Sequence, residues 1–294
     1  MKGDAMNSIS QIILEAACKI AHEAEAKAML LYADLVDYMP FSEEEKPCYD
    51  LIVVTRGEEE IPDRIRNRSV LINVPDVKLT RLGQIKIAIT KGIAMGILQK
   101  GDTVVCLSGV SRFGYADSLF VIDVGKEFEI LTSENITGIT DTVYPEVFGT
   151  VLNLALELAA QGREGRKVGT IFILGDHERV LQLSRQMIIN PFMGYAEEQR
   201  NILNPELKET IKEFSAIDGA FVIKDNGVLV TAGRHLSAAL EGKDFPHGLG
   251  SRHIAAAGIT SITQAIAIVL SESSGNVTVF KNGKVFVSIE KPSE

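Results

Sequence analysis

The sequence predicts an α/β protein made of two units, a parallel-sheet unit in the first half and a mixed-sheet unit flanked by helices in the second. Short apolar runs and a helical stretch follow one another over residues 27–124, and strands that alternate with helices imply a parallel sheet. In the second half, Asp225-Asn226-Gly227 and Asn282-Gly283 each separate two apolar runs and indicate antiparallel hairpins. A polar stretch of weak periodicity, residues 125–142, lies between the halves.

The first half contains one long amphipathic helix followed by alternating strands and helices. Residues 8–24 place apolar side chains on one helical stripe, and Ser8 with Gln11 forms a capping box at its start. Strands are expected at residues 27–33, 50–55, 69–74, 103–108 and 118–124, with a helix at 79–99.

The second half begins with a helix whose apolar face runs from residue 147 to 159 and which ends before Gly162. A basic loop, residues 162–167, precedes a buried strand at 168–174, and Asn204-Pro205 opens a further helix. The remaining expected strands are 220–223, 228–231, 266–270, 277–280 and 285–289. We therefore place two domains at residues 1–128 and 129–294.

Composition excludes several classes of protein. The net charge of -9 and pI of about 5.2 argue against nucleic acid or an anionic membrane as partner, since both need a basic face. The three cysteines have neither disulfide nor zinc-ligand spacing. No run of about 18 apolar residues and no signal-peptide core occur, so we expect a cytoplasmic protein without a membrane anchor.

A glycine-rich segment in the second half suits a phosphate group. Gly250, Ser251, Arg252 and His253 follow Gly248 and precede a helix-compatible alanine run. Backbone N–H groups at a helix start bind phosphate, and a guanidinium can donate two hydrogen bonds to phosphate oxygens. The alternative is a glycine turn with an ordinary helix cap.

Two further polar pairs lie next to predicted strands. Asp218-Gly219 stands between a helix and an apolar strand, where the carboxylate could hold a divalent cation. Ser271 and Glu272 close the strand at 266–270 and could contact phosphate or metal. The alternatives are common turn pairs in both places.

Taken together and in order, these motifs resemble the diadenylate cyclase (DAC) domain over residues from about 147 to 289. The first half, through Lys100-Gly101-Asp102-Thr103-Val104-Val105 and Gly114-Tyr115-Ala116-Asp117, is similar to the C-terminal domain of pyruvate kinase, an arrangement that resembles the archaeal branch of these enzymes. The motifs of the second half that carry the resemblance are Gly162-Arg163-Glu164-Gly165, Gly169-Thr170-Ile171-Phe172, Asn190-Pro191-Phe192, Asp218-Gly219-Ala220, Gly250-Ser251-Arg252-His253 and Ser271-Glu272.

The resemblance implies condensation of two ATP molecules into cyclic di-AMP and two pyrophosphates, at a site between two face-to-face protomers of a homo-oligomer. It implies Mg²⁺ or Mn²⁺ as cofactor, bound by Asp218, and a regulatory or oligomerising role for residues 1–128. The implied catalytic residues are Asp218, Arg252 and His253. The implied nucleotide-binding residues are Gly219, Ala220, Leu236, Gly250, Ser251, Arg252, His253, Ser271 and Glu272, with Leu236 against adenine or simply in the core.

The sequence departs from the family pattern at two positions. Ile254 stands where a third basic residue is usual, and Ile217 stands where some relatives carry a metal-binding His. The missing cation keeps a second interpretation open, a nucleotide-binding sensor module without catalysis. The candidates for the missing cation are Arg163, Arg166, Lys167 and Arg234.

Overall fold

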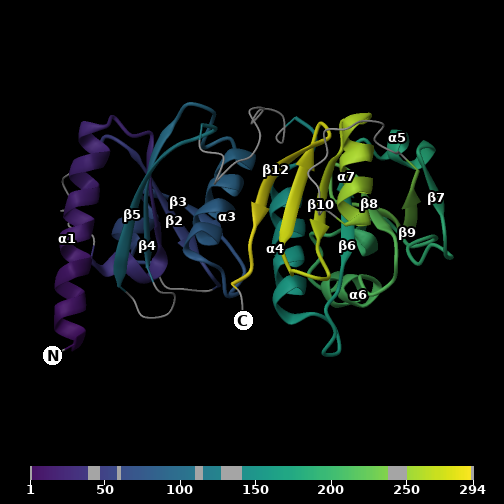
Figure 1. The fold of residues 1–294 in the computed structure, drawn as a ribbon, viewed down its shortest axis with the longest axis horizontal. Helices are drawn as coiled ribbons and strands as arrows, with labels where there is room; N and C mark the ends of the chain where they lie inside the picture. Colours follow the sequence, from purple (N-terminus) through teal and green to yellow (C-terminus); the bar gives the residue numbers. More distant parts are fainter. Residues whose placement is uncertain are drawn as a thin grey trace.

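The computed structural model describes residues 2–38, 47–57, 61–109, 115–126, 141–237 and 250–292. These residues form two β-sheets with helices between and outside them, which confirms the predicted α/β class (Figure 1). The predicted domain boundary near residue 128 lies outside the described residues, so the division at that position stays a prediction.

The first sheet has the strand order β3-β2-β1-β4-β5. Strands β1 to β4 are parallel, as predicted, but β5 runs antiparallel to β4. The expectation of a wholly parallel sheet is therefore wrong at this edge, because the connection at residues 110–115 is too short for the crossover that a parallel pair requires. The strands are β1 (Ala28–Tyr32), β2 (Asp50–Thr55), β3 (Ser69–Asn73), β4 (Thr103–Gly109) and β5 (Ala116–Asp123).

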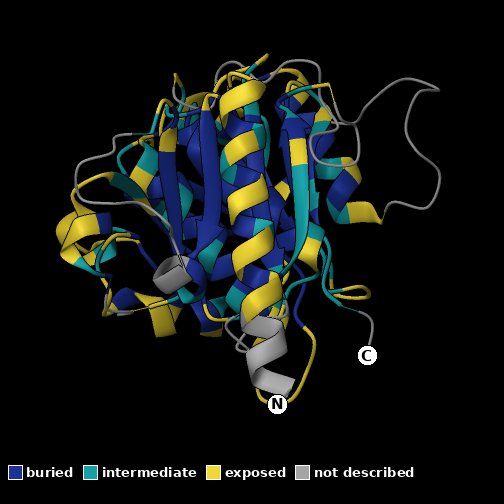
Figure 2. Cartoon of the chain, turned by 90° about the vertical axis from the view of Figure 1, so that its left-hand side faces the viewer, coloured by how far each residue is buried: buried dark blue, intermediate teal, exposed yellow. Residues whose placement is uncertain are grey.

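Helix α1 (Lys2–Glu23) covers the outer face of this sheet and α3 (Arg81–Ala94) the inner face. Strand β1 is therefore buried along its whole length, and its side chains alternate between the two core clusters. The outward stripe of α1 is exposed and the strands behind it are buried (Figure 2). The predicted capping box is wrong, because α1 begins at Lys2 and Ser8 lies inside the helix. A short helix α2 (Asp63–Arg66) and a 3-10 turn η1 (Ala33–Tyr38) complete this half.

The second sheet has the order β12-β11-β10-β6-β8-β9-β7, with only β6 and β8 parallel. Both predicted hairpins, β8–β9 and β11–β12, are confirmed. The strands are β6 (Thr170–Leu174), β7 (Ser184–Gln186), β8 (Ala220–Ile223), β9 (Leu229–Leu236), β10 (Ile266–Leu270), β11 (Val277–Lys281) and β12 (Lys284–Ile289).

Helices pack on both faces of the second sheet. Helix α4 (Pro145–Gln161) buries its apolar face on one side, and α7 (Ser251–Ser261) buries its alanines on the other. Gly162 ends α4 with a φ of 62°, as its position after the apolar stripe predicted. Three short elements, α5 (His177–Gln182), α6 (Leu207–Phe214) and the 3-10 turn η2 (Glu198–Arg200), complete this half.

The two halves share a hydrophobic core. One cluster of buried side chains runs from the inner face of the first sheet through α3 and α4 into the second sheet. Lys86 of α3 also donates to both carboxylate oxygens of Glu290, at 2.9 and 2.8 Å, just after β12. Among the described residues, no helix combines the length and the apolar character needed to cross a bilayer.

Candidate active site

The topology of the second sheet brings three of the predicted segments to one edge. Strands β6 and β8 are parallel, with Ile171 opposite Ala220, so their amino ends lie together. Strand β10 runs antiparallel to β6, with Leu270 opposite Thr170, and its carboxyl end therefore reaches the same edge. Asp218, Gly169 and Ser271-Glu272 all adjoin that edge.

Arg252 connects the polar side chains of this edge. Its Nη1 donates to Glu272 Oε2 at 3.2 Å, and its Nη2 lies 3.7 Å from Asp218 Oδ1. A Cβ at Gly169 would lie 2.7 Å from Arg252 Nη1, so only glycine leaves room for the guanidinium in this position. Two motifs that are 34 positions apart in the sequence thus form one cluster, since Asp218 and Arg252 are an ion pair.

A cleft of about 710 Å³ opens beside this cluster. Gly250 precedes the first turn of α7 and has extended backbone. Among the described residues, no side-chain hydrogen bond caps that turn. Ser251 and Arg252 therefore present the start of a helix to the cleft, the arrangement that favours phosphate. The cleft is lined by Lys167, Gly250, Ser251, Arg252, His253, Ser271, Glu272, Ser273, Ser274, Asn276, Thr278 and Ser288.

His253 lies at the inner wall of the cleft. Its ring packs edge-on against Phe280, with centroids 5.9 Å apart, and its exposure is only 7%. Burial lowers the pKa of His253 below its usual value, and the positive charge of Arg252 lowers it further. The neutral imidazole is therefore the form that this site favours.

The four candidates for the third cation differ in their partners in the structure. Arg163 pairs with Glu209 and Glu213, and Arg234 donates to Ser184 and Leu181, where it joins β9 to β7. Both are thus engaged elsewhere in the fold.

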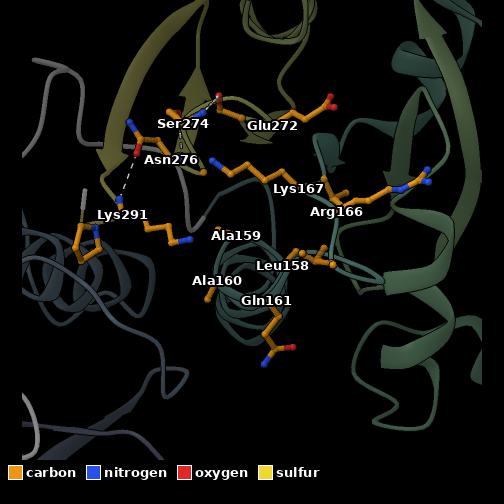
Figure 3. Close-up of a pocket in the computed structure, with 16 residues that line it drawn as sticks. Leu158, Ala159, Ala160, Gln161, Arg166, Lys167, Glu272, Ser274, Asn276 and Lys291 are labelled. Carbon is orange, nitrogen blue, oxygen red and sulfur yellow. Dashed lines mark hydrogen bonds between the residues drawn. The ribbon is translucent and has the colours of Figure 1, made fainter. Parts of the chain in front are cut away.

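Lys167 alone among the four candidates lines the cleft next to Arg252. It also lines an adjoining cavity of about 520 Å³ beyond Glu272. Figure 3 shows the Lys167 and Lys291 side chains entering this cavity between the end of α4 and the turn that carries Ser274 and Asn276. Arg166 also lines the cavity, but its guanidinium points away from it. Ile254, at the position of the usual cation, is 44% exposed.

Three other predicted nucleotide-binding residues have structural roles in this fold. Gly219 has a φ of 109°, and a Cβ there would lie 2.7 Å from the carbonyl carbon of Gly233, so the backbone of β9 itself requires glycine. Ala220 is buried at the start of β8, opposite Ile171. Leu236 is buried at the end of β9 in the cluster that packs α7 on the sheet, and its contact with adenine stays a prediction.

Sequence reasoning missed the far wall of the cleft. Thr278 of β11 and Ser288 of β12 face each other there, with their hydroxyl oxygens 3.4 Å apart, and Asn276 precedes them. The predicted hairpin around Asn282-Gly283 could have indicated this pair, because hydroxyl side chains on two antiparallel strands can lie opposite each other.

The donor set fits a divalent cation that is shared with a substrate. Asp218 is 83% exposed and Glu272 58% exposed as side chains, so their oxygens are accessible on either side of Arg252. Mg²⁺ typically takes one or two protein carboxylates and completes its shell with phosphate oxygens and water. The part of the chain that the structure describes holds no group of three or more metal-ligating side chains.

Comparison with known proteins identifies the class. Residues 157–285 match the family described as "DisA bacterial checkpoint controller nucleotide-binding", and residues 10–132 match "Probable sensor domain DacZ_P". A crystal structure of DacA from Staphylococcus aureus aligns over 48% of this chain and 85% of that chain, with 18% identity and a TM-score of 0.33. The likeness of the first half to pyruvate kinase stays a prediction.

Two curated relatives give the family. The chain is 39% identical to a diadenylate cyclase of Methanocaldococcus jannaschii over 67% of its own length and 63% of the relative's. It is 38% identical to a diadenylate cyclase of Haloferax volcanii over 70% of its own length and 75% of the relative's. Fold and site thus define an α/β protein in which Arg252 joins Asp218 and Glu272 beside the start of α7. The chain belongs to the diadenylate cyclase family, as its motifs predicted.

Proposed function

We propose that this chain condenses two ATP molecules into cyclic di-AMP and two pyrophosphates. The observation that carries the proposal is the cluster in which Arg252 reaches both Asp218 and Glu272 beside the open start of α7. Family membership supports it, because the relatives are named as diadenylate cyclases. The cytoplasm is where we place the reaction, since ATP is available there.

Phosphate binding is the role of the cleft. The first N–H groups of α7 and the Arg252 guanidinium donate to the triphosphate, and the Ser271 hydroxyl adds a donor on the opposite side. Lys167 takes the part of the third cation, because its ammonium lies at the same cleft. These groups offset negative charge that develops on the α-phosphoryl group and the departing pyrophosphate.

Asp218, with Glu272 beside it, would hold the Mg²⁺ or Mn²⁺ of this family. Such an ion, when bound, lowers the pKa of a coordinated hydroxyl and screens the phosphate charge. The Asp218 carboxylate accepts a hydrogen bond from the attacking 3'-hydroxyl, orients it, takes its proton as the new bond forms and then releases that proton to solvent. The new bond joins the 3'-oxygen of one ATP to the α-phosphorus of the other, and the bond from that phosphorus to the bridging oxygen breaks to release pyrophosphate. A second such step in the opposite sense closes the ring.

Two protomers facing each other would supply the two ATP molecules. Asp218 lies at the surface of a single chain, with 83% of its side chain exposed, where water competes for the reacting groups. A second copy placed over this edge would cover Asp218 and bring its own ATP to the first. This exposure supports a catalytic homodimer.

A nucleotide-binding sensor is the second candidate, and Ile254 is the observation that favours it. Incubation of the purified chain with ATP and Mg²⁺ or Mn²⁺, followed by mass spectrometry, separates the two. The cyclase produces cyclic di-AMP, and Asp218→Asn does not. ATP that is bound but recovered unchanged from the wild type would favour the sensor.

A further inference from the structure

A second cleft of about 360 Å³ lies between the two halves and shares no lining residue with the cleft of the candidate active site. Arg56 and Asn73 line it from the first half, and Thr150 and Asn153 line it from α4. Asn204, in the segment after η2, also lines the cleft. Any molecule held here would touch both halves at once.

The cleft lies at the carboxyl ends of parallel strands. Arg56 directly follows β2, Asn73 ends β3, and the Arg56 guanidinium stacks 4.2 Å from the ring centre of Tyr32, which ends β1. Loops at the carboxyl ends of parallel strands are where open α/β sheets bind their ligands. The fold therefore places this cleft where ligand sites commonly occur.

Arg56 is the cation of the lining that points to an anionic ligand, because Lys208, the other lining cation, is paired with Glu157. The carboxylates of Asp76 and Glu157 also line the cleft. The Arg56 guanidinium is held by the Tyr32 ring and by Asp34, whose Oδ2 is 3.5 Å from Nη1. Lys91 lies behind Asn73 and donates to its carbonyl oxygen, and a Cβ on Gly149 of α4 would be only 3.6 Å from Nζ. Lys91 is 7% exposed, and no carboxylate of the described residues lies within 4.0 Å of its ammonium. Lys91 does not itself line the cleft, but its buried charge favours an anion nearby.

An unpaired acceptor indicates that the ligand also carries hydrogen-bond donors. The Oδ1 atom of Asn153 is buried and has no hydrogen-bond partner in the described part of the chain. A buried polar atom without a partner costs free energy. Because Asn153 lines the cleft, a rotation of its amide would bring this oxygen to a ligand hydroxyl or amino group. Lys208 on the far wall is already paired with Glu157 at 2.7 Å, so the unmet polar capacity is on the Asn153 side.

We propose that this cleft binds a small organic anion that bears O–H or N–H donors, with Arg56 on the anionic group and Asn153 on a donor. The bound molecule bridges the carboxyl ends of the first sheet and α4 of the second half. This inference does not rest on the proposed cyclase activity, and its test does not use that activity.

Thermal unfolding of the full-length chain tests the proposal with two defined probes, 3-phosphoglycerate and L-glutamate. They distinguish a phosphate ester with hydroxyl donors from a carboxylate with an ammonium donor, and nucleotides are avoided because they would occupy the candidate active site. At about 10 mM, one of the two should raise the Tm of the wild type by about 3 °C. Arg56→Met should reduce that shift at least about threefold, whereas Arg185→Met, a matched change at an exposed arginine, should retain it.

Asn153→Leu provides a second variant in case Arg56→Met fails to fold. It removes the unpaired acceptor, keeps a similar volume, and should also lose the shift. Inorganic phosphate, which has no organic body, should shift the wild type less than the better probe. The proposal is wrong if neither probe stabilises the wild type, or if the shift survives in both cleft variants.

Discussion

Lys91 offers a direct test of how the two halves pack. The lysine is 7% exposed between α3 and α4, and burial alone lowers its pKa from 10.5 to about 8. Each pKa unit corresponds to about 1.4 kcal/mol, so keeping Lys91 charged in the fold costs about 3 kcal/mol at neutral pH. Between pH 8 and 10.5 the unfolded chain holds a proton that the folded chain lacks, and wild-type stability should rise with pH over that window.

The assay is urea unfolding of the wild type and Lys91→Met at pH 7 and pH 10. The advantage of the variant should fall by about 2 to 3 kcal/mol from pH 7 to pH 10, because the charge penalty disappears as Lys91 titrates. The hydrogen bond to Asn73 is lost at both pH values, and its dependence on the charge of Lys91 is already part of the pKa difference between the folded and unfolded chain. Lys284→Met, at an exposed position, should show no such pH dependence. A pH-independent difference for Lys91→Met would refute the burial of an uncompensated charge.

Four further predictions concern the site and the fold. Asp218→Asn should abolish cyclic di-AMP formation and leave the Kd for ATP within about tenfold in titration calorimetry, since positioning survives; unchanged turnover contradicts the assignment. Lys167→Ala should raise the KM for ATP about tenfold in steady-state kinetics, and Arg166→Ala should raise it less than about twofold. Equal effects would contradict the role of Lys167 as the third phosphate-binding cation. Gly219→Ala should lower the free energy of unfolding in urea by about 3 kcal/mol. Gly165→Ala should lower it by only about 1 kcal/mol, because a Cβ at Gly165 meets nothing within 4 Å. Similar losses would mean that the backbone of β9 shifts to accommodate the Cβ at position 219. Specific activity should rise with protein concentration until the catalytic dimer saturates, and a constant value across the dissociation range would argue against that dimer.

Elements with strong local patterns were predictable from the sequence. The strands of the first sheet, α4 with its terminal Gly162, and the two hairpins all follow from periodicity and turn chemistry. Elements as short as α5 and β7 were not, because six- and three-residue segments complete no repeat that a pattern could show. The start of α1 was missed because Ser8 has the chemistry of a helix cap although the helix continues before it.

The candidate active site was likewise predictable only in part. Its residues were predicted from motifs, and the structure brings Asp218, Arg252 and Glu272 together as an ion-pair cluster. Their proximity depends on which strands are parallel, and local sequence does not determine that. The selection of Lys167 among four cations likewise depends on partners that lie far away in the chain, such as Glu209 for Arg163.

The shared core of the two halves also lay beyond sequence reasoning. Helix α3 and the apolar face of α4 were both predicted, but each helix could have packed within its own half. Contact between them places the carboxyl ends of the first sheet against the second half, and the cleft beside Asn153 exists only because of that contact.

The ratio of pyrophosphate to cyclic di-AMP distinguishes a two-ATP cyclase from a protein that only binds ATP. The purified wild-type chain should convert ATP, in the presence of Mn²⁺ or Mg²⁺, into cyclic di-AMP and pyrophosphate, with cyclic di-AMP measured by mass spectrometry and pyrophosphate by an enzyme-coupled assay. Two 3'-hydroxyl attacks per ring require about two pyrophosphates for each cyclic di-AMP. That ratio is the predicted result. ATP recovered intact, or pyrophosphate released without cyclic di-AMP, would contradict a two-ATP cyclase.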